Sequence, residues 1–442
     1  MARTADISFD FAAYLGRYVD HGTTVTVQRL NGGLTNFTAR ATFDPPITRP
    51  SKSLIHSQSI RTIGVNPLVE EGRKGLLLHH VILKHARPYL AADPSQPTVG
   101  IARQANEASA LHLLSSLEHQ SFRRHGPKGT GGHPRQELGS GWSIRVPVLV
   151  FHDTVADVLW IEDLGSCRSI SEVLRSVDKG YHFSKSMETI ASQLAGFLVD
   201  LYSMTREAAM EELKKDGLKG MQWGESAINE HLGCLSFKVM KAYNIDDATE
   251  LAQRVKDSLY QRDKEGLCLG MVDFWPENVL INREDGRCGL IDWEYFGISS
   301  PASELGMFGE PSHHPSIHHA DTVTAAHMRL HVLRSDTTPE GKKAIQRFLE
   351  ELFRAYYEAT SKPSRYFKWR LLTCHGREMV NSLPLYPKLT QYLKRRIAFA
   401  GMRALHAAWV SEDTMSTNEM DQVEDHWILR MFGLEHHSHQ AN

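Results

Sequence analysis

The chain has 442 residues, enough for two or three domains, and its 41% hydrophobic and 23% charged residues are typical of a soluble globular protein. Lys and Arg number 50 and Asp and Glu number 52, so a formal charge of −2 gives no indication of nucleic acid as a partner. No apolar run is long enough for a membrane span or a signal peptide, and the 5 cysteines form no C-x-x-C pair, so we expect a cytoplasmic protein with free thiols.

The first strands expected along the chain form a hairpin with a glycine-rich tip. Apolar and polar residues alternate at Val25 and Val27 and again over residues 37–43, with Gly32-Gly33 in the turn between them. Such a tip can bring backbone N–H groups close to phosphates, because glycine has no side chain. Gly32, Gly33 and Asn36 are therefore candidate nucleotide-binding residues, and a turn that only connects two strands is the alternative.

A third strand is expected to end in a lysine. The apolar run from Leu76 to Leu83 is followed by Lys84, and burying an unpaired ammonium group is costly. Lys84 therefore needs a carboxylate or a phosphate as a partner. A helical pattern further along the chain carries Glu107 in its first half, and phosphotransferases of the kinase fold pair a strand lysine with a helix glutamate beside the nucleotide phosphates. We predict that pair here, with a solvent-exposed helix face as the alternative for Glu107.

Two segments of unusual composition interrupt this N-terminal part. Residues 45–75 contain prolines, serine-rich stretches and a charge cluster, which favour a surface insertion. Residues 119–141 are rich in Gly, His and Arg, which favours a mobile loop. We expect both segments to be insertions in the N-terminal lobe.

The tetrapeptide that begins at Glu162 predicts a hinge. Two strand-like runs precede Glu162-Asp163-Leu164-Gly165, which breaks their pattern. A kinase fold has its hinge at this point, where exposed backbone groups would meet the adenine edge. Glu162, Asp163 and Leu164 are therefore candidate nucleotide-binding residues.

Beyond the hinge, the chain is expected to be mainly helical. Apolar residues recur at helical spacing over residues 190–201 and 345–356. We predict residues 1–162 as an N-terminal nucleotide-binding lobe and residues 163–442 as a C-terminal lobe that carries the catalytic and acceptor-binding residues.

The most informative stretch surrounds Asp273. Asn278 follows in the pattern D-x4-N, and the apolar runs 279–281 and 289–291 predict two short buried strands joined by a turn, with Asp292 after the second. Such a hairpin would bring Asp273, Asn278 and Asp292 together. Phosphoryl transfer needs this arrangement, with one carboxylate to orient the attacking hydroxyl and an Asn and a second carboxylate to hold Mg²⁺. Turn or cap roles are the alternative for either aspartate alone.

At these residues the chain resembles the aminoglycoside phosphotransferase/choline kinase superfamily of small-molecule kinases. Asp292-Trp293-Glu294 is similar to the D-x-E of choline kinases and methylthioribose kinases. The resemblance implies that Asp273 is the catalytic base and that Asn278, Asp292 and Glu294 are Mg²⁺ ligands.

The resemblance extends to the N-terminal strands and includes two departures. The strand ending in Lys84 looks like that of methylthioribose kinases, and fungal 4-hydroxytryptamine kinases look closer still over this strand and residues 29–36. Met271 stands where many members have His, as in 4-hydroxytryptamine kinases, and Glu304 stands where an Asp usually braces the catalytic loop. We expect Met271 to be a packing residue and the longer Glu304 to brace the loop in the same way.

We therefore expect an α+β, protein-kinase-like two-lobed fold, with an antiparallel sheet plus helix in the N-terminal lobe and a larger, mainly helical C-terminal lobe. The expected activity is ATP- and Mg²⁺-dependent phosphorylation of a small metabolite's hydroxyl, and the resemblance suggests a hydroxylated amine or a sugar-like alcohol. The absence of an A-P-E motif favours such an acceptor over a peptide. Two alternatives stay open: a nucleotide-binding pseudokinase, and a metal-binding interaction protein whose many histidines cluster in space. For the histidine pairs at 313–314 and 318–319 we expect a surface loop, because no ligand-spaced Cys or carboxylate lies beside them. Nothing in the sequence indicates the oligomeric state.

Overall fold

The structure is a computed structural model, and it divides into two compact units. It describes residues 9–30, 36–48, 77–88, 102–125, 143–177, 183–214, 236–245, 247–260, 266–282, 284, 287–308, 326–332, 334–360, 364–385 and 389–413. The N-terminal unit comprises Met1–Ser140, Arg145–Ser166 and Gly289–Phe296, and the C-terminal unit comprises Gly141–Ile144, Cys167–Cys288 and Gly297–Asn442. The segment Gly289–Phe296 therefore belongs to the first unit, although the predicted lobe limits assigned it to the second.

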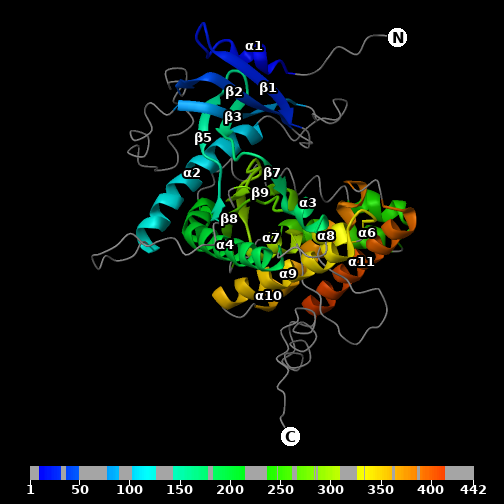
Figure 1. Cartoon of the computed structure of the whole chain (residues 1–442). Helices are drawn as coiled ribbons and strands as arrows, with labels where there is room; N and C mark the ends of the chain where they lie inside the picture. Colours follow the sequence, from blue (N-terminus) through cyan, green and yellow to red (C-terminus); the bar gives the residue numbers. More distant parts are fainter. Residues whose placement is uncertain are drawn as a thin grey trace. The chain divides into compact units, whose positions relative to one another are not determined.

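A five-stranded antiparallel sheet forms the centre of the N-terminal unit, drawn in blue to blue-green in Figure 1. In spatial order the strands are β1 (Thr24–Leu30), β2 (Asn36–Thr48), β3 (Leu77–Ala86), β6 (Val158–Glu162) and β5 (Leu149–Asp153). The helices described in this unit are α1 (Phe11–Leu15) and α2 (Ala102–His125). The predicted alternation along β2 is confirmed, because Ala39, Ala41 and Phe43 are buried in one core with Leu15 and Trp160.

The first residues of both predicted insertions belong to regular elements of the described chain. Strand β2 continues to Thr48 and therefore includes residues 45–48. The pairing of β1 with β2 ends at Asp44, and the register of β2 on β3 shifts between Thr42 and Ile47, so this end of the strand tolerates residues without an N–H group. Helix α2 continues to His125 because its last turns contain neither Gly nor Pro, and it therefore includes residues 119–125. The remaining residues of both segments lie outside the described part of the chain.

The C-terminal unit is mainly helical. Its longer helices are α4 (Phe183–Lys214), α6 (Ala248–Tyr260), α9 (Pro339–Ala359), α10 (Arg365–Asn381) and α11 (Gln391–Asp413), and its shorter ones are α3 (Ile170–Arg175), α7 (Pro301–Phe308) and α8 (Ala326–Val332). Helix α4 packs on α9, and α10 packs on α7 and α11 (Figure 1). The predicted apolar stripe of α4 is confirmed, since Ile190, Leu194 and Leu198 are buried.

Short strands hold the predicted catalytic stretch of this unit. Strand β8 (Cys268–Gly270) pairs with β11 (Gly297–Ser299), and β9 (Val279–Asn282) lies between β7 (Cys167–Ser169) and β10 (Arg287–Leu290). The expected hairpin of two strands around residues 279–291 is thus present as β9 and β10. The other elements among the described residues are strand β4 (Ser143–Arg145) and the one-turn helices η4 (Pro276–Asn278) and η5 (Leu383–Leu385).

The predicted fold class is confirmed. An antiparallel sheet with a long helix forms the N-terminal part, and a larger helical part follows, as expected for an α+β kinase-like protein. Among the described residues, no helix combines the length and the apolar character that a membrane span requires.

Candidate active site

Lys84 of β3 lies at the centre of a buried polar cluster in the N-terminal unit. Its Nζ lies 2.6 Å from Oε2 of Glu107 and 2.6 Å from Oδ1 of Asp292. Burial alone would lower the pKa of Lys84, but the charges of Asp292 and Glu107 raise it above its usual value, so the ammonium group stays charged. The ion pair between Lys84 and Glu107 that the sequence predicted is present, and Asp292 is a second partner.

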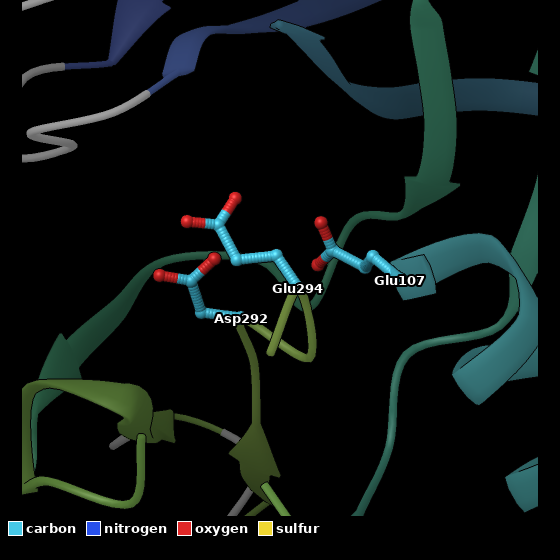
Figure 2. Close-up of side chains that lie close together, drawn as sticks. All are labelled: Glu107, Asp292 and Glu294. Atoms are coloured by element: carbon cyan, nitrogen blue, oxygen red, sulfur yellow. The ribbon is translucent and has the colours of Figure 1, made fainter. Parts of the chain in front are cut away.

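Three carboxylates of this unit lie close together (Figure 2). Glu107, Asp292 and Glu294 each place one carboxylate oxygen within 4.8 Å of the others. Burial raises the pKa of Glu107 to about 7 despite the opposing charge of Lys84, and burial together with the charge of Asp292 raises the pKa of Glu294. A cation with oxygen ligands would offset this repulsion, and Mg²⁺ prefers oxygen ligands. The donor set therefore fits Mg²⁺.

Helix α2 fixes the segment that carries Glu294. The Oε2 of Glu294 accepts a hydrogen bond from Nδ2 of Asn36 at 2.7 Å and lies 3.3 Å from Nε of Arg103, which is fully buried. Asn106 donates to the backbone carbonyl of Glu294 at 3.0 Å. The sequence analysis missed Arg103 and Asn106, although their i, i+3, i+4 spacing with Glu107 places all three on one side of the helix.

The backbone at Asp292 has an unusual conformation. Asp292 has φ of 70°, a left-handed value that Asp and Asn tolerate better than most residues. The next side chain, Trp293, is fully buried, and its Nε1 donates to the carbonyl of Leu290 at 2.9 Å. This anchor fixes the turn, so Asp292 stays beside Lys84 with its side chain 30% exposed.

The side chains of the predicted hinge are engaged in contacts within the N-terminal unit. Glu162 pairs with Arg145 at 2.5 Å, and Asp163 pairs with Arg40 of β2 at 2.7 Å. Arg40 also donates to the carbonyl of Gly165 at 2.7 Å. Leu164 is buried. These contacts fix the backbone of Glu162, Asp163 and Leu164, and nucleotide binding by that backbone stays a prediction.

In the C-terminal unit, Glu304 braces the backbone just before Asp273. Its Oε1 accepts from the backbone N of Val272 at 3.0 Å, and its Oε2 accepts from the hydroxyl of Tyr202 at 2.8 Å. Val272 has φ of 64°, which β-branched residues rarely adopt. Gly270 leaves the space for this brace, because a Cβ there would lie 1.9 Å from Oε1 of Glu304. The longer Glu304 thus reaches the loop, as expected.

Asp273 and Asn278 lie on the same loop. The Nδ2 of Asn278 donates to the carbonyl of Asp273 at 2.9 Å, and the backbone N of Asn278 donates to the carbonyl of Trp275 at 3.0 Å. Asp273 and Asn278 belong to the C-terminal unit, whereas Asp292 and Glu294 belong to the N-terminal unit. Their convergence on one metal ion therefore stays a prediction.

Glu277, between these two residues, makes contacts that the sequence analysis did not identify. Its Oε1 lies 2.8 Å from Nε2 of His331 and accepts from the hydroxyl of Ser171 at 2.9 Å. Burial would raise the pKa of Glu277, but the hydrogen bond and charge of His331, the charge of His327 and the hydrogen bond of Ser171 lower it to about 2. Burial lowers the pKa of His331, and the hydrogen bond and charge of Glu277 oppose this shift. The sequence could not predict the contact between Glu277 and His331, because no motif or spacing links the two residues.

Two sets of predicted residues lie outside the described part of the chain. They are the glycines Gly32 and Gly33, and the histidine pairs at 313–314 and 318–319. Phosphate binding by the glycine-rich tip and the surface loop expected at the histidine pairs both stay predictions.

Comparison with known proteins gives one family match. Residues 174–357 match the family described as phosphotransferase enzyme family. Among curated proteins, none matches the chain.

Similar solved structures include the GDP complex of an aminoglycoside 2'-phosphotransferase IIIa mutant, with 10% identity over 92% of this chain and 98% of that chain and a TM-score of 0.42. They also include the ternary complex of streptomycin, ATP and APH(2")-IIa, with 12% identity over 86% and 93% of the two chains and a TM-score of 0.37. A third, described as an aminoglycoside phosphotransferase from Ralstonia eutropha, has 10% identity over 91% and 97% and a TM-score of 0.43.

At these TM-scores the solved structures carry no argument about function, and the family match covers less than half of the chain. The matched range contains the motif of Asp273, Asn278 and Asp292 that predicted this superfamily. Residues 174–357 are thus similar to the phosphotransferase enzyme family.

Proposed function

We propose that this protein is an ATP- and Mg²⁺-dependent kinase that transfers the γ-phosphoryl group to a hydroxyl of a small metabolite. The observation that carries the proposal is the buried Lys84, whose ammonium group contacts both Glu107 and Asp292 at 2.6 Å. A lysine paired with a helix glutamate and placed beside a metal-binding aspartate is the arrangement that phosphoryl transfer uses to hold nucleotide phosphates. A purely structural ion pair would need only one carboxylate.

In this proposal each candidate site residue has a role. Lys84, fixed by Glu107, binds the α- and β-phosphates. Asn278, Asp292 and Glu294 supply the oxygen ligands of Mg²⁺, and the bound ion would neutralise charge on the phosphates. Two further segments bind the nucleotide. They are the glycine-rich tip, with Gly32, Gly33 and Asn36, and the backbone of Glu162, Asp163 and Leu164.

Asp273 is the proposed catalytic base. Its carboxylate accepts a hydrogen bond from the acceptor hydroxyl, whose oxygen forms a bond to the γ-phosphorus while the bond from that phosphorus to the bridging oxygen of ADP breaks. The hydroxyl proton passes to Asp273 late in the transfer, because the transition state is loose and requires alignment first. The acceptor classes that the sequence resemblance suggests are hydroxylated amines and sugar-like alcohols.

The proposal is tested by incubating the protein with Mg²⁺, ATP and a library of hydroxylated metabolites and recording mass spectra. We expect one library class to gain the mass of a phosphoryl group, and we expect no gain when EDTA removes the Mg²⁺. Tight binding of Mg²⁺-ATP without a phosphorylated product from any compound would contradict the proposal and favour a nucleotide-binding pseudokinase.

A further inference from the structure

We propose that Glu277 is a positioning residue that fixes the catalytic loop by anchoring it to two helices of the C-terminal unit. The inference rests on the proposed function, because it concerns the segment from Asp273 to Asn278. Glu277 occupies the position immediately before Asn278, inside the one-turn helix η4. No role in metal or phosphate binding is assigned to it.

The carboxylate of Glu277 makes a polar contact between this loop and its surroundings. Its Oε1 accepts from Ser171 of α3 at 2.9 Å and lies 2.8 Å from Nε2 of His331 of α8. The hydroxyl of Ser171 also lies 3.0 Å from the hydroxyl of Ser169, which can donate to it. The proton of Ser171 is then directed at Glu277. Two donors from two helices thus meet one carboxylate oxygen.

The loop's internal hydrogen bonds cannot fix its position by themselves. Asn278 bonds to the carbonyls of Asp273 and Trp275, so these bonds close the loop on itself. They would persist if the loop moved as a body. Pro276, at the start of η4, restricts the backbone but makes no hydrogen bond from its nitrogen. The place of the loop relative to the helices therefore depends on its outward contacts: Phe274 stacks on Phe308 of α7 with ring centroids 4.6 Å apart, and the carboxylate of Glu277 contacts α3 and α8.

The two donors are themselves held in place. Arg175, at the end of α3, pairs with Asp336 at 3.1 Å, and the hydroxyl of Thr338 donates to the carbonyl of Val177 at 2.8 Å. These contacts join the end of α3 to the turn between α8 and α9. A Cβ at Gly341 would lie 2.7 Å from the carbonyl oxygen of Arg175, so glycine permits the close approach of α9. Helices α3, α8 and α9 therefore present Ser171 and His331 as a preformed pair of donors.

A positioning role requires the shape and hydrogen-bond acceptors of Glu277 and not its charge. Glu277→Gln keeps a carbonyl oxygen that can accept from both donors, whereas Glu277→Ala removes the anchor. Misalignment of a reacting group by about 1 Å can reduce a rate about 10²-fold. We expect Glu277→Ala to lower kcat about 10- to 100-fold with little change in the Kd of Mg²⁺-ATP, and Glu277→Gln to stay within about 3-fold of the wild type.

The experiment measures ATP hydrolysis with water as the acceptor, together with binding of a fluorescent ATP analogue and hydrogen exchange of the peptide that covers residues 273–278. Ser171→Ala and His331→Phe remove one donor each and keep Glu277, so intermediate losses of kcat are expected from both. Glu284→Ala is the matched control, because Glu284 is an exposed carboxylate close in sequence and outside the proposed machinery. Its kcat and exchange should equal those of the wild type.

Hydrogen exchange of the 273–278 peptide should be faster in Glu277→Ala than in the wild type and nearly unchanged in Glu277→Gln. The inference is overturned if Glu277→Ala keeps wild-type kcat and exchange, or if Glu277→Gln loses as much kcat as Glu277→Ala, since charge would then be required. If the wild type transfers phosphate neither to water nor to any library compound, the proposed function fails. The exchange measurement still decides whether Glu277 holds the loop.

Discussion

A methyl group added at Gly270 should disrupt the brace behind the catalytic loop. In Gly270→Ala, the new Cβ would lie 1.9 Å from Oε1 and 2.6 Å from Cδ of Glu304. Real Cβ atoms do not approach so closely, so the carboxylate must move. Its movement is restricted because Glu304 is only 1% exposed and accepts hydrogen bonds from Val272 and Tyr202.

The size of the effect follows from the contacts that Glu304 would lose. A hydrogen bond to an ionised group contributes about 1.5–3 kcal/mol, and a neutral one contributes about 1 kcal/mol. Burial raises the pKa of Glu304, while the hydrogen bonds from Val272 and Tyr202 lower it. Loss of both bonds should therefore lower the free energy of unfolding by about 3 kcal/mol. Release of Val272 from its left-handed conformation should also lower kcat, because Asp273 is the next residue.

Urea unfolding of a double-mutant cycle tests this steric account. Gly270→Ala should lower the free energy of unfolding by about 3 kcal/mol in the wild type. In a Glu304→Ala background, where the clashing atoms are absent, it should lower that free energy by less than about 1 kcal/mol. Gly196→Ala is the control, because Gly196 lies in helix α4 with no atom within 4 Å of the added Cβ, so it should stabilise the protein by about 0.5–1 kcal/mol. If Gly270→Ala lowered the free energy of unfolding equally in both backgrounds, a clash with Glu304 would not be the cause.

Three further changes test other parts of the account. Asp292→Asn should weaken Mg²⁺-dependent nucleotide binding in a fluorescence titration, and Glu294→Gln should weaken it less; an unchanged Mg²⁺ dependence in Asp292→Asn would remove that ligand. Met271→Leu should keep most of the wild-type kcat because Met271 is fully buried and a packing role tolerates this change; a loss as large as that of Asp273→Ala would mean that the position takes part in the chemistry. Burial lowers the pKa of His85 from 6.5 to about 4. The unfolded chain therefore takes up this proton first, and the free energy of unfolding should fall as the pH decreases from about 6.5 to 4. His85→Phe should show a smaller fall over this range, and an identical pH dependence would contradict the assignment.

Much of the site could be predicted because its signals are local or follow from a strong physical cost. Lys84 at the end of an apolar strand required a partner, and Glu107 was the suitable carboxylate on the next helix. The spacing of Asp273, Asn278 and Asp292 around two short strands predicted the hairpin that β9 and β10 form.

Contacts between distant parts of the sequence could not be predicted in this way. The hydroxyl of Tyr202 meets Glu304 across 102 positions, and Asn36 meets Glu294 across 258. No periodicity or spacing encodes such pairs, because they depend on how the elements pack. The space for Glu304 also depends on the missing side chain of Gly270, which in sequence is only a glycine at the end of a strand.

The limits of elements and units were also difficult to predict. Composition suggested insertions from residues 45 and 119, but strand pairing and helix propensity carry β2 to Thr48 and α2 to His125. The segment Gly289–Phe296 joins the N-terminal unit although it lies far along the chain, since Asn106 binds its backbone carbonyls. The amino-acid composition of a segment does not indicate which unit the segment joins.

The most direct test of the central claim is phosphate transfer from ATP to the acceptor identified by the metabolite screen, measured for the wild type and for Asp273→Asn. A general base typically contributes about 10²- to 10⁴-fold to the rate, so kcat of Asp273→Asn should fall by that order while the Kd of Mg²⁺-ATP stays nearly unchanged. Equal turnover by the two proteins would contradict the role of Asp273 and with it the proposed mechanism.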